Sequence, residues 1–264
     1  MNTSATKAFS DLQKGLSMHG VWWSLAWHEI KQRYSRSVIG PFWITLSTAV
    51  MVAAMGPLYG ALLGQSVSSY VQHLAISLII WTFISVTVNE AGTVFIGAEG
   101  YIKQVALPLS VYVLKVISKN LLMLAHNCVV IVVVLCLLPP GNFNSMWMVP
   151  FGLLLVVCNL CWLVLLLGML SARYRDIPQL VNNIIQVTLF LSPIIWSVEM
   201  LPPGKRYLAD FNPLFHFIEV IRAPLLGKSI HSVSWWVVTA MMVSGSILTF
   251  LVFKKFRSRV PYWL

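Results

Sequence analysis

Residues 147–170 read WMVPFGLLLVVCNLCWLVLLLGML, and this stretch decides the class of the protein. It contains no Asp, Glu, Lys or Arg, and the charge-free interval extends from Lys119 to Arg173. A helix that crosses the hydrocarbon core of a bilayer needs about 20 consecutive apolar residues. The stretch therefore predicts a transmembrane helix.

The chain around this stretch has the same character. Hydrophobic residues make up 58% of the 264 positions and charged residues only 10%, whereas soluble domains carry about 25% charged residues. We therefore expect an all-α integral membrane protein with six transmembrane helices. The other five spans are predicted near 41–63, 73–94, 117–138 and 177–198, and between Lys228 and Lys254.

The distribution of Lys and Arg predicts the orientation of these spans. Basic residues precede the first span, follow the sixth, and lie between spans two and three and between spans four and five. The short loops 64–72 and 139–146 carry none. Because cytoplasmic loops are enriched in Lys and Arg, both termini are expected in the cytoplasm. The basic residues in 199–230, on the outer side, depart from this pattern.

The N-terminal segment divides the chain into a cytoplasmic part, 1–36, and a transmembrane domain, 37–264. Within 22–36, aromatic and aliphatic side chains recur at helical spacing, which predicts an amphipathic helix in the membrane interface. This helix is either a surface anchor or a docking surface for a cytoplasmic partner. The residues available for docking are His28, Glu29, Lys31, Arg33 and Tyr34.

A second candidate contact lies between spans two and three. Glu99 and Lys103 are four residues apart in the polar break 97–108, a spacing that favours a helical ion pair, and Tyr101 lies between them. A short helix here is placed to contact a soluble subunit. The alternative is an ordinary loop.

Two regions suggest contacts with a transported molecule. Arg173 and Arg175 precede span five, where they either set the topology or bind an anionic headgroup or pyrophosphate. Pro193 predicts a kink within span five. Phe190 and Trp196 flank it, and they either stack on sugar rings in a pore or belong to the core and the interfacial aromatic belt.

The loop 199–230 is predicted to contain a short helix after Asn212-Pro213. It is too short to span a membrane, so we expect it to be interfacial or re-entrant on the outer side. Phe217, Glu219 and Arg222 lie on it. Gly56, Gly60 and Gly64 in span one permit close helix packing, either within the chain or between two copies.

Several motifs are absent or weak. Gly227-Lys228-Ser229 resembles the end of a P-loop, but Arg222 stands where the first Gly belongs. No ATP site, catalytic motif or metal motif is expected in the chain. Cys158 and Cys161 have C-x-x-C spacing without a second ligand pair and are interpreted as small apolar residues. The net charge is +10, but the Lys and Arg residues flank apolar runs and do not form one patch. This placement argues against nucleic-acid binding.

Sequence motifs in the expected order resemble those of ABC-2 type permeases for polysaccharide export. They are WHEIKQRY at 27–34, SVIGPFW at 37–43, Arg175-Asp176, Ser192-Pro193-Ile194 and the spacing from Asn212-Pro213 to Glu219 and Arg222. The resemblance covers most of the chain. Residues 45–48, TLST, depart from it, because many relatives have a proline there.

The resemblance implies a homodimeric permease in the bacterial inner membrane that works with two copies of a separate ATPase, which binds ATP and Mg²⁺. The cargo would be a polysaccharide such as O antigen on undecaprenyl pyrophosphate. Segments 22–36 and 97–108 would contact the ATPase, Arg173 and Arg175 the pyrophosphate, and Phe217, Glu219 and Arg222 would form an outer gate. The channel would be lined by Trp43, Tyr59, Phe190, Pro193 and Trp196.

Two other functions remain open from the residues alone. One is an ABC-2 permease for a drug or small lipid. The other is a membrane protein without transport activity, such as a transferase or a scaffold.

Overall fold

The computed structural model describes residues 3–35, 37–40, 42–228 and 231–264, and every regular element within these ranges is helical. Five helical stretches are long and apolar enough to cross a membrane. They contain α3 (Phe42–Leu62), α4 (Val67–Ala91), α6 (Leu109–Leu137), α7 (Val149–Arg173) and α11 (Ser232–Phe256).

Shorter helices complete the chain. The α-helices among them are α1 (Thr3–Ser17), α2 (His19–Tyr34), α5 (Glu99–Gln104), α8 (Ile177–Leu191), α9 (Tyr207–Asp210), α10 (Pro213–Leu225) and α12 (Val260–Trp263). Four 3₁₀ turns join them, namely η1 (Ile96–Ala98), η2 (Met146–Met148), η3 (Val198–Met200) and η4 (Arg257–Arg259).

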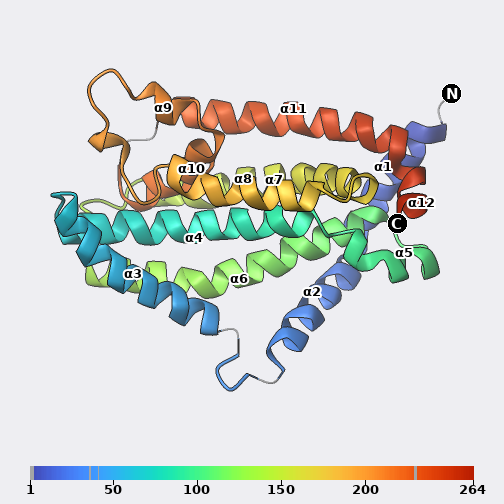
Figure 1. Ribbon diagram of the computed structural model, residues 1–264, viewed down its shortest axis with the longest axis horizontal. Coiled ribbons are helices and arrows are strands. Elements are labelled where there is room, and N and C mark those ends of the chain that lie inside the picture. Colours follow the sequence, from blue (N-terminus) through green and yellow to red (C-terminus); the bar gives the residue numbers. More distant parts are fainter. Residues whose placement is uncertain (1–2, 36, 41, 229–230) are drawn as a thin grey trace.

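The long helices lie side by side, and the two ends of the bundle differ (Figure 1). Both chain ends lie at one end with α1, α5 and α12, and we call this the terminal end. The opposite end carries the turn between α3 and α4 together with α9, and we call it the loop end. Helices α4, α6, α7 and α11 run between these two ends, whereas α3 extends from the loop end only toward the middle of the bundle.

The core is built around α4. In its most apolar stretch 78% of the residues are buried, against 11% in α3 and 22% in α11. Helices α6, α7, α8 and α10 all contact α4. The outward faces of α3 and α8 instead carry exposed apolar side chains, including Val50, Leu58, Ile184 and Phe190.

The predicted starts of two spans are wrong. The polar residues of 64–72 were expected to form a loop, but α4 already begins at Val67, where Ser66 Oγ accepts the Ser69 N–H at 3.3 Å as an N-cap. Helix α6 begins at Leu109 and not near 117, directly after Pro108. Polar side chains can stay in a helix when the helix has a cap and a packed neighbour.

The predicted span 177–198 is shorter than expected, because its helix α8 ends at Leu191. Ser192 is extended, with φ −90° and ψ 148°, as a residue before proline prefers. Pro193 has no N–H to continue the helical bonding. At 1.5 Å per residue, α8 is roughly 22 Å long, less than the ~30 Å hydrocarbon core. Within the described residues, the structure thus gives five long candidate spans and one short apolar helix.

The predicted amphipathic helix 22–36 corresponds to α2, with one correction. Trp23 and Trp27 are about half exposed, at 49% and 52%, but Ile30 on the same predicted stripe is only 6% exposed. The face around Ile30 packs on α6. Arg36 lies outside the described residues.

The small residues of span one serve packing within the chain. A Cβ at Gly56 would lie 2.5 Å from Val71 Cγ2, and one at Gly60 would lie 3.4 Å from Val67 Cα. Both contacts are with α4. Gly64 follows α3 with φ +65°, a conformation that glycine adopts without strain.

The short helix predicted after Asn212 is confirmed as α10. Asn212 Oδ1 accepts the Leu214 N–H at 3.0 Å, and Pro213 occupies the first turn. The helix at 99–103 is also present as α5, with Lys103 Nζ 2.6 Å from Glu99 Oε1.

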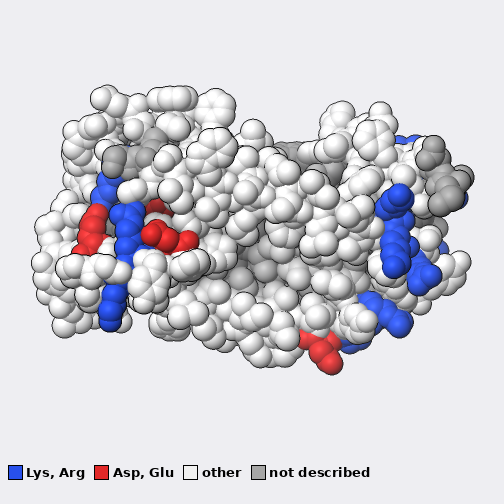
Figure 2. Space-filling view, turned by 90° about the horizontal axis from the view of Figure 1, so that it is seen from above, with Lys and Arg blue, Asp and Glu red and all other residues white. Residues whose placement is uncertain are grey.

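Charged side chains gather at the two ends of the molecule. Figure 2 shows blue and red atoms together at one end and mainly blue atoms at the other, with a broad uncharged region between them. This distribution fits a protein whose middle lies in hydrocarbon and whose ends lie in water.

Candidate functional site

At the loop end, α10 buries an ion pair. Arg222 is 4% exposed, and its Nε and Nη2 donate to Glu219 Oε2 at 3.0 and 2.5 Å. The two residues are three positions apart, so they lie on one face of α10. Glu219 thereby neutralises a guanidinium group whose charge would be costly to bury alone.

Arg222 also connects α10 to two other segments. Its Nη1 donates to Ser77 Oγ on α4 at 2.9 Å and to the Pro193 carbonyl at 2.6 Å. His73 Nε2 lies 3.4 Å from the same nitrogen. The carbonyl of Pro193 belongs to the break after α8, so one side chain ties that break to the central helix.

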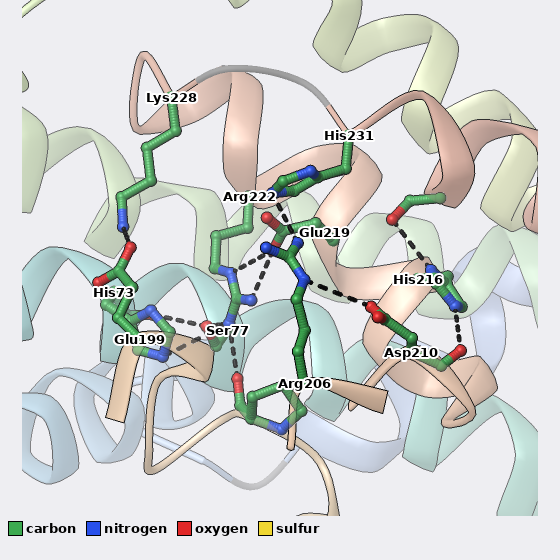
Figure 3. A network of polar contacts seen from close by, with 12 residues as sticks. His73, Ser77, Glu199, Arg206, Asp210, His216, Glu219, Arg222, Lys228 and His231 are labelled. Carbon is green, nitrogen blue, oxygen red and sulfur yellow. Dashed lines mark hydrogen bonds and ion pairs between the residues drawn. The ribbon is translucent and has the colours of Figure 1, made fainter. Parts of the chain in front are cut away.

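A polar cavity of about 430 Å³ opens beside this ion pair (Figure 3). Its charged lining is largely paired, since Lys228 Nζ lies 2.6 Å from Glu199 Oε1 and Arg206 Nη2 lies 2.8 Å from His231 Nε2. Arginine only donates hydrogen bonds, so His231 accepts here through Nε2. The cavity offers donors and acceptors to a hydroxyl-rich ligand without a large net charge.

Phe217 does not share this location. It is 9% exposed and packs in an apolar cavity beside Ile84, Val88 and Ile185. The structure therefore brings Glu219 and Arg222 together and places Phe217 in the core.

Phe190 and Trp196 lie together at the end of α8. Trp196 Nε1 donates to the Phe190 carbonyl at 3.0 Å, and both residues line a cavity of about 540 Å³ with Leu208 and Phe211. Phe190 is 69% exposed. These rings form an apolar, outward-facing surface.

The remaining residues predicted to line a channel do not join this surface. Trp43 and Tyr59 lie near opposite ends of α3, roughly 24 Å apart at 1.5 Å per residue. Trp43 is 53% exposed, whereas Tyr59 is half-buried. Pro193 is buried and bound through its carbonyl to Arg222.

A second polar cluster lies toward the terminal end, where α2 crosses α4 and α6. The Lys119 side chain is 4% exposed, and its Nζ lies 2.5 Å from Glu29 Oε1 and 2.7 Å from Glu90 Oε1. Asn120 Nδ2 donates to Glu90 Oε2 at 3.0 Å. One buried cation thus joins α2 to the end of α4.

A second lysine completes the surroundings of Glu29. Lys115 Nζ lies 2.8 Å from Glu29 Oε2. Burial raises the pKa of Glu29, but the hydrogen bonds from Lys115 and Lys119 outweigh it and leave the pKa below the ordinary value. The carboxylate is therefore held ionised between the two lysines.

Comparison with known proteins identifies the family. Residues 20–226 match the model of the family described as ABC-2 type transporter. The chain belongs to the ABC-2 type transporter family. Two relatives, both named O-antigen export system permease protein RfbA from Klebsiella pneumoniae, are each 21% identical over 239 residues. The matched region covers 88% of this chain and 90% of each relative.

In this ABC-2 chain, the residues predicted to contact an ATPase fall into two groups. Glu29 faces inward, in the cluster with Lys115 and Lys119, and Arg33 Nη2 lies 3.7 Å from Glu90 Oε1. Arg33 is nonetheless half-exposed. The remaining predicted residues also lie at the surface of α2 and α5 and are accessible in full or in part: His28, Lys31, Tyr34, Glu99, Tyr101 and Lys103.

One structural residue of the ABC-2 chain was not predicted. Asp11 on α1 is 2% exposed, and its carboxylate accepts the N–H groups of Leu109 and Ser110 at 3.2 and 3.1 Å. It also accepts from Arg257 Nε at 2.6 Å. Asp11 thus caps α6 from another helix and ties it to the end of α11.

Sequence carries a partial signal for this contact. Ala8, Asp11, Leu12 and Gly15 recur at helical spacing, and a Cβ at Gly15 would lie 2.0 Å from Ser110 Oγ. The pattern indicates a helix with a close-packed face. The partner of that face lies 99 residues away in sequence at Ser110 and becomes visible only in the structure.

The two arginines before α8 both contact Trp263 in this ABC-2 chain, Arg173 at its ring and Arg175 at its backbone. Arg173 lines a pocket at the ends of α7 and α11. Arg175 Nη2 donates to the carbonyls of Trp263 and Leu264, each at 3.4 Å.

Proposed function

We propose that the chain is the membrane subunit of an ATP-driven exporter that moves a polysaccharide across the bacterial inner membrane. The match to an O-antigen export permease over 88% of the chain, together with the ABC-2 family, carries this proposal. The cargo we propose is O antigen linked to undecaprenyl pyrophosphate, which places the protein in lipopolysaccharide biosynthesis.

ABC-2 permeases work with an ABC ATPase partner. We propose two copies of each subunit, with ATP and Mg²⁺ bound by the ATPases. The surface residues of α2 and α5 would contact the ATPase, since both helices lie toward the terminal end (Figure 1). In the proposed orientation this end, with both chain ends, faces the cytoplasm, because the bare loops lie at the other end.

The proposed channel lies between two copies of the chain. In this proposal a second copy, in place of lipid, covers the large apolar side chains that α3 and α8 expose on their outward faces. Helix α8 and the segment after it would complete a sixth crossing. Phe190 and Trp196 would offer ring faces to sugars, whose C–H faces are apolar.

At the loop end, Glu219 and Arg222 border the polar cavity and would belong to the outer gate with α10. At the terminal end, Arg173 and Arg175 carry positive charge near the ends of α7 and α12 and would meet the pyrophosphate of the cargo. Phe217 would support the outer gate at the loop end from within the core.

Deletion of the gene, followed by fractionation of lipid-linked glycans, tests the proposal. We expect the glycan to disappear from the cell surface and to accumulate, still bound to its carrier, on the cytoplasmic side. Expression of the native chain should restore export. An unchanged surface glycan combined with an altered sensitivity to drugs would show that the cargo belongs to another class.

A further inference from the structure

A basic pocket of about 410 Å³ lies at the terminal end, where α7, η4 and α12 meet. Two arginines line it, Arg173 from the end of α7 and Arg259 from η4. The aromatic rings of Tyr174, Phe256 and Trp263 lie beside these arginines in the lining. Two chain segments that are distant in sequence, 169–174 and 252–263, therefore build one cationic, aromatic pocket.

The rings position the guanidinium groups and leave their donors free. Arg173 Cζ lies 5.7 Å from the Trp263 ring centroid and 5.9 Å from that of Tyr174. Arg259 Cζ lies 5.7 Å from the Phe256 centroid. Contacts with a ring face orient a guanidinium plane but use none of its five N–H donors.

These two arginines differ from the others that the structure describes. Four arginines lie within 4 Å of a carboxylate: Arg33, Arg206, Arg222 and Arg257. Arg175 donates to backbone carbonyls. Within the described ranges, neither Arg173 nor Arg259 has a carboxylate or hydrogen-bond partner. A planar fork of free donors matches the geometry of a phosphate group.

The rest of the pocket is apolar. Met169 and Leu170 from α7 and Val252 from α11 form this part, and all three belong to long apolar helices. Met169 is itself buried, so Leu170 and Val252 are the accessible apolar residues. A free inorganic anion would leave them uncovered. A molecule with both a phosphate group and a hydrocarbon chain would satisfy both parts of the pocket.

We infer that this pocket binds the phosphate headgroup of an anionic amphiphile, with its hydrocarbon chains against the ends of α7 and α11. Arg173 and Arg259 bind the phosphate, and Trp263 lies at the level of the headgroup. Basic pockets between transmembrane helices on the cytoplasmic side are suited to anionic lipids. The inference rests on the proposed membrane orientation and does not depend on the glycan.

Two sources supply this chemistry: an ordinary membrane phospholipid and the lipid pyrophosphate of the proposed cargo. Native mass spectrometry of the purified full chain can measure the binding of phosphatidylglycerol against phosphatidylcholine. We expect a preference for phosphatidylglycerol. In R173Q/R259Q its affinity should fall roughly 25-fold, from about fivefold for each cation near a membrane surface.

The matched control is K7Q/K14Q, which removes two exposed cations from α1 at the same end of the molecule. It should bind phosphatidylglycerol like the native chain. The variant R173K/R259K keeps the charge but loses the planar fork, and we expect an intermediate affinity. If the double glutamine variant does not fold, R259Q alone should show about a fivefold loss.

Competition identifies the source. Displacement of phosphatidylglycerol by undecaprenyl pyrophosphate at lower concentration assigns the pocket to the cargo carrier, and weaker displacement assigns it to membrane phospholipid. Equal binding of both phospholipids, or unchanged affinity in R173Q/R259Q, would overturn the inference. Because the measurement involves no transport, a failed export assay and a failed lipid assay are separate results.

Discussion

At the residue scale, two charged side chains hold the architecture at opposite ends. Arg222 joins α10, α4 and the break at Pro193, and Lys119 joins α2 to α4 through Glu29 and Glu90. Each is about 4% exposed. Removing one partner of such a cluster leaves the others buried without compensation, which costs more than the cluster contributes in total.

We therefore predict that Lys119→Met lowers the free energy of unfolding by about 3 kcal/mol. The two carboxylates would then face each other without the lysine between them. Thermal unfolding of the purified protein in detergent measures the change. Lys254→Met, at an exposed position, is the control and should leave the midpoint nearly unchanged. Equal midpoints for both variants would contradict the buried bridge.

Glu29 gives the cluster a defined pH dependence. Its pKa in the folded protein lies below the ordinary value of 4.5. A lowered folded-state pKa contributes stability above the ordinary value, and the contribution is lost as the pH falls through the folded-state pKa. We predict that the thermal midpoint of the native chain falls below pH 4.5 more steeply than that of Glu29→Gln. If the thermal midpoints of the native chain and of Glu29→Gln fell in parallel with pH, the ionisation of Glu29 would not contribute to stability.

At the element scale, α1 is a brace between α6 and α11. Asp11 is its main polar contact, because the carboxylate accepts two N–H groups at the start of α6 and pairs with Arg257. The first N–H groups of a helix have no partner within it, so an acceptor from another element replaces a local cap.

Loss of this acceptor should release α1. We predict that Asp11→Ala destabilises the protein by about 1–3 kcal/mol, the cost of buried N–H groups without a partner. Hydrogen exchange in residues 4–17 should rise markedly, while exchange in α4 should change little. Asp210→Ala, which removes a more exposed carboxylate at the other end, should leave exchange in α1 as it is. If Asp210→Ala raised exchange in α1 as much as Asp11→Ala does, the effect would not depend on the contacts of Asp11.

The sequence predicted those elements whose cause is local. Asn212-Pro213 predicts α10, and the long charge-free intervals predict α7, α11 and the part of α6 after Lys119. It did not predict where α8 ends. The pattern of apolar residues continues past Pro193, but the helix ends at Leu191. It also placed Glu29 on a docking surface, since the lysines that bind it lie about 90 residues away, on α6.

At the scale of the whole molecule, the two ends have different chemistry. The loop end pairs its cations with carboxylates around a polar cavity, whereas the terminal end has two pocket arginines, Arg173 and Arg259, that have no carboxylate partner among the described residues. Figure 2 shows mainly blue atoms at that end. An excess of Lys and Arg favours the cytoplasmic side of a membrane. This asymmetry supports the proposed orientation.

Cysteine labelling tests that orientation. After replacement of the four native cysteines, Ser68→Cys and Asn144→Cys should react with a membrane-impermeant maleimide in intact cells. Tyr101→Cys should react only after the cells are opened, because α5 would face the cytoplasm. The reverse pattern would refute the orientation, and labelling of all three positions in intact cells would refute the spans between them.

The short length of α8 has an electrostatic consequence for the proposed path. An ordinary bilayer opposes a polar polymer with a low-dielectric slab about 30 Å thick. Helix α8 covers roughly 22 Å of this thickness. Beyond α8 the polar cavity at the loop end reaches Ser197 and Glu199, so water would come closer to the bilayer centre along the proposed path. The slab is thinner there, and so is the distance over which a hydroxyl-rich chain must travel without hydration. The membrane potential would also fall across this shorter distance, which concentrates the electric field beside α8.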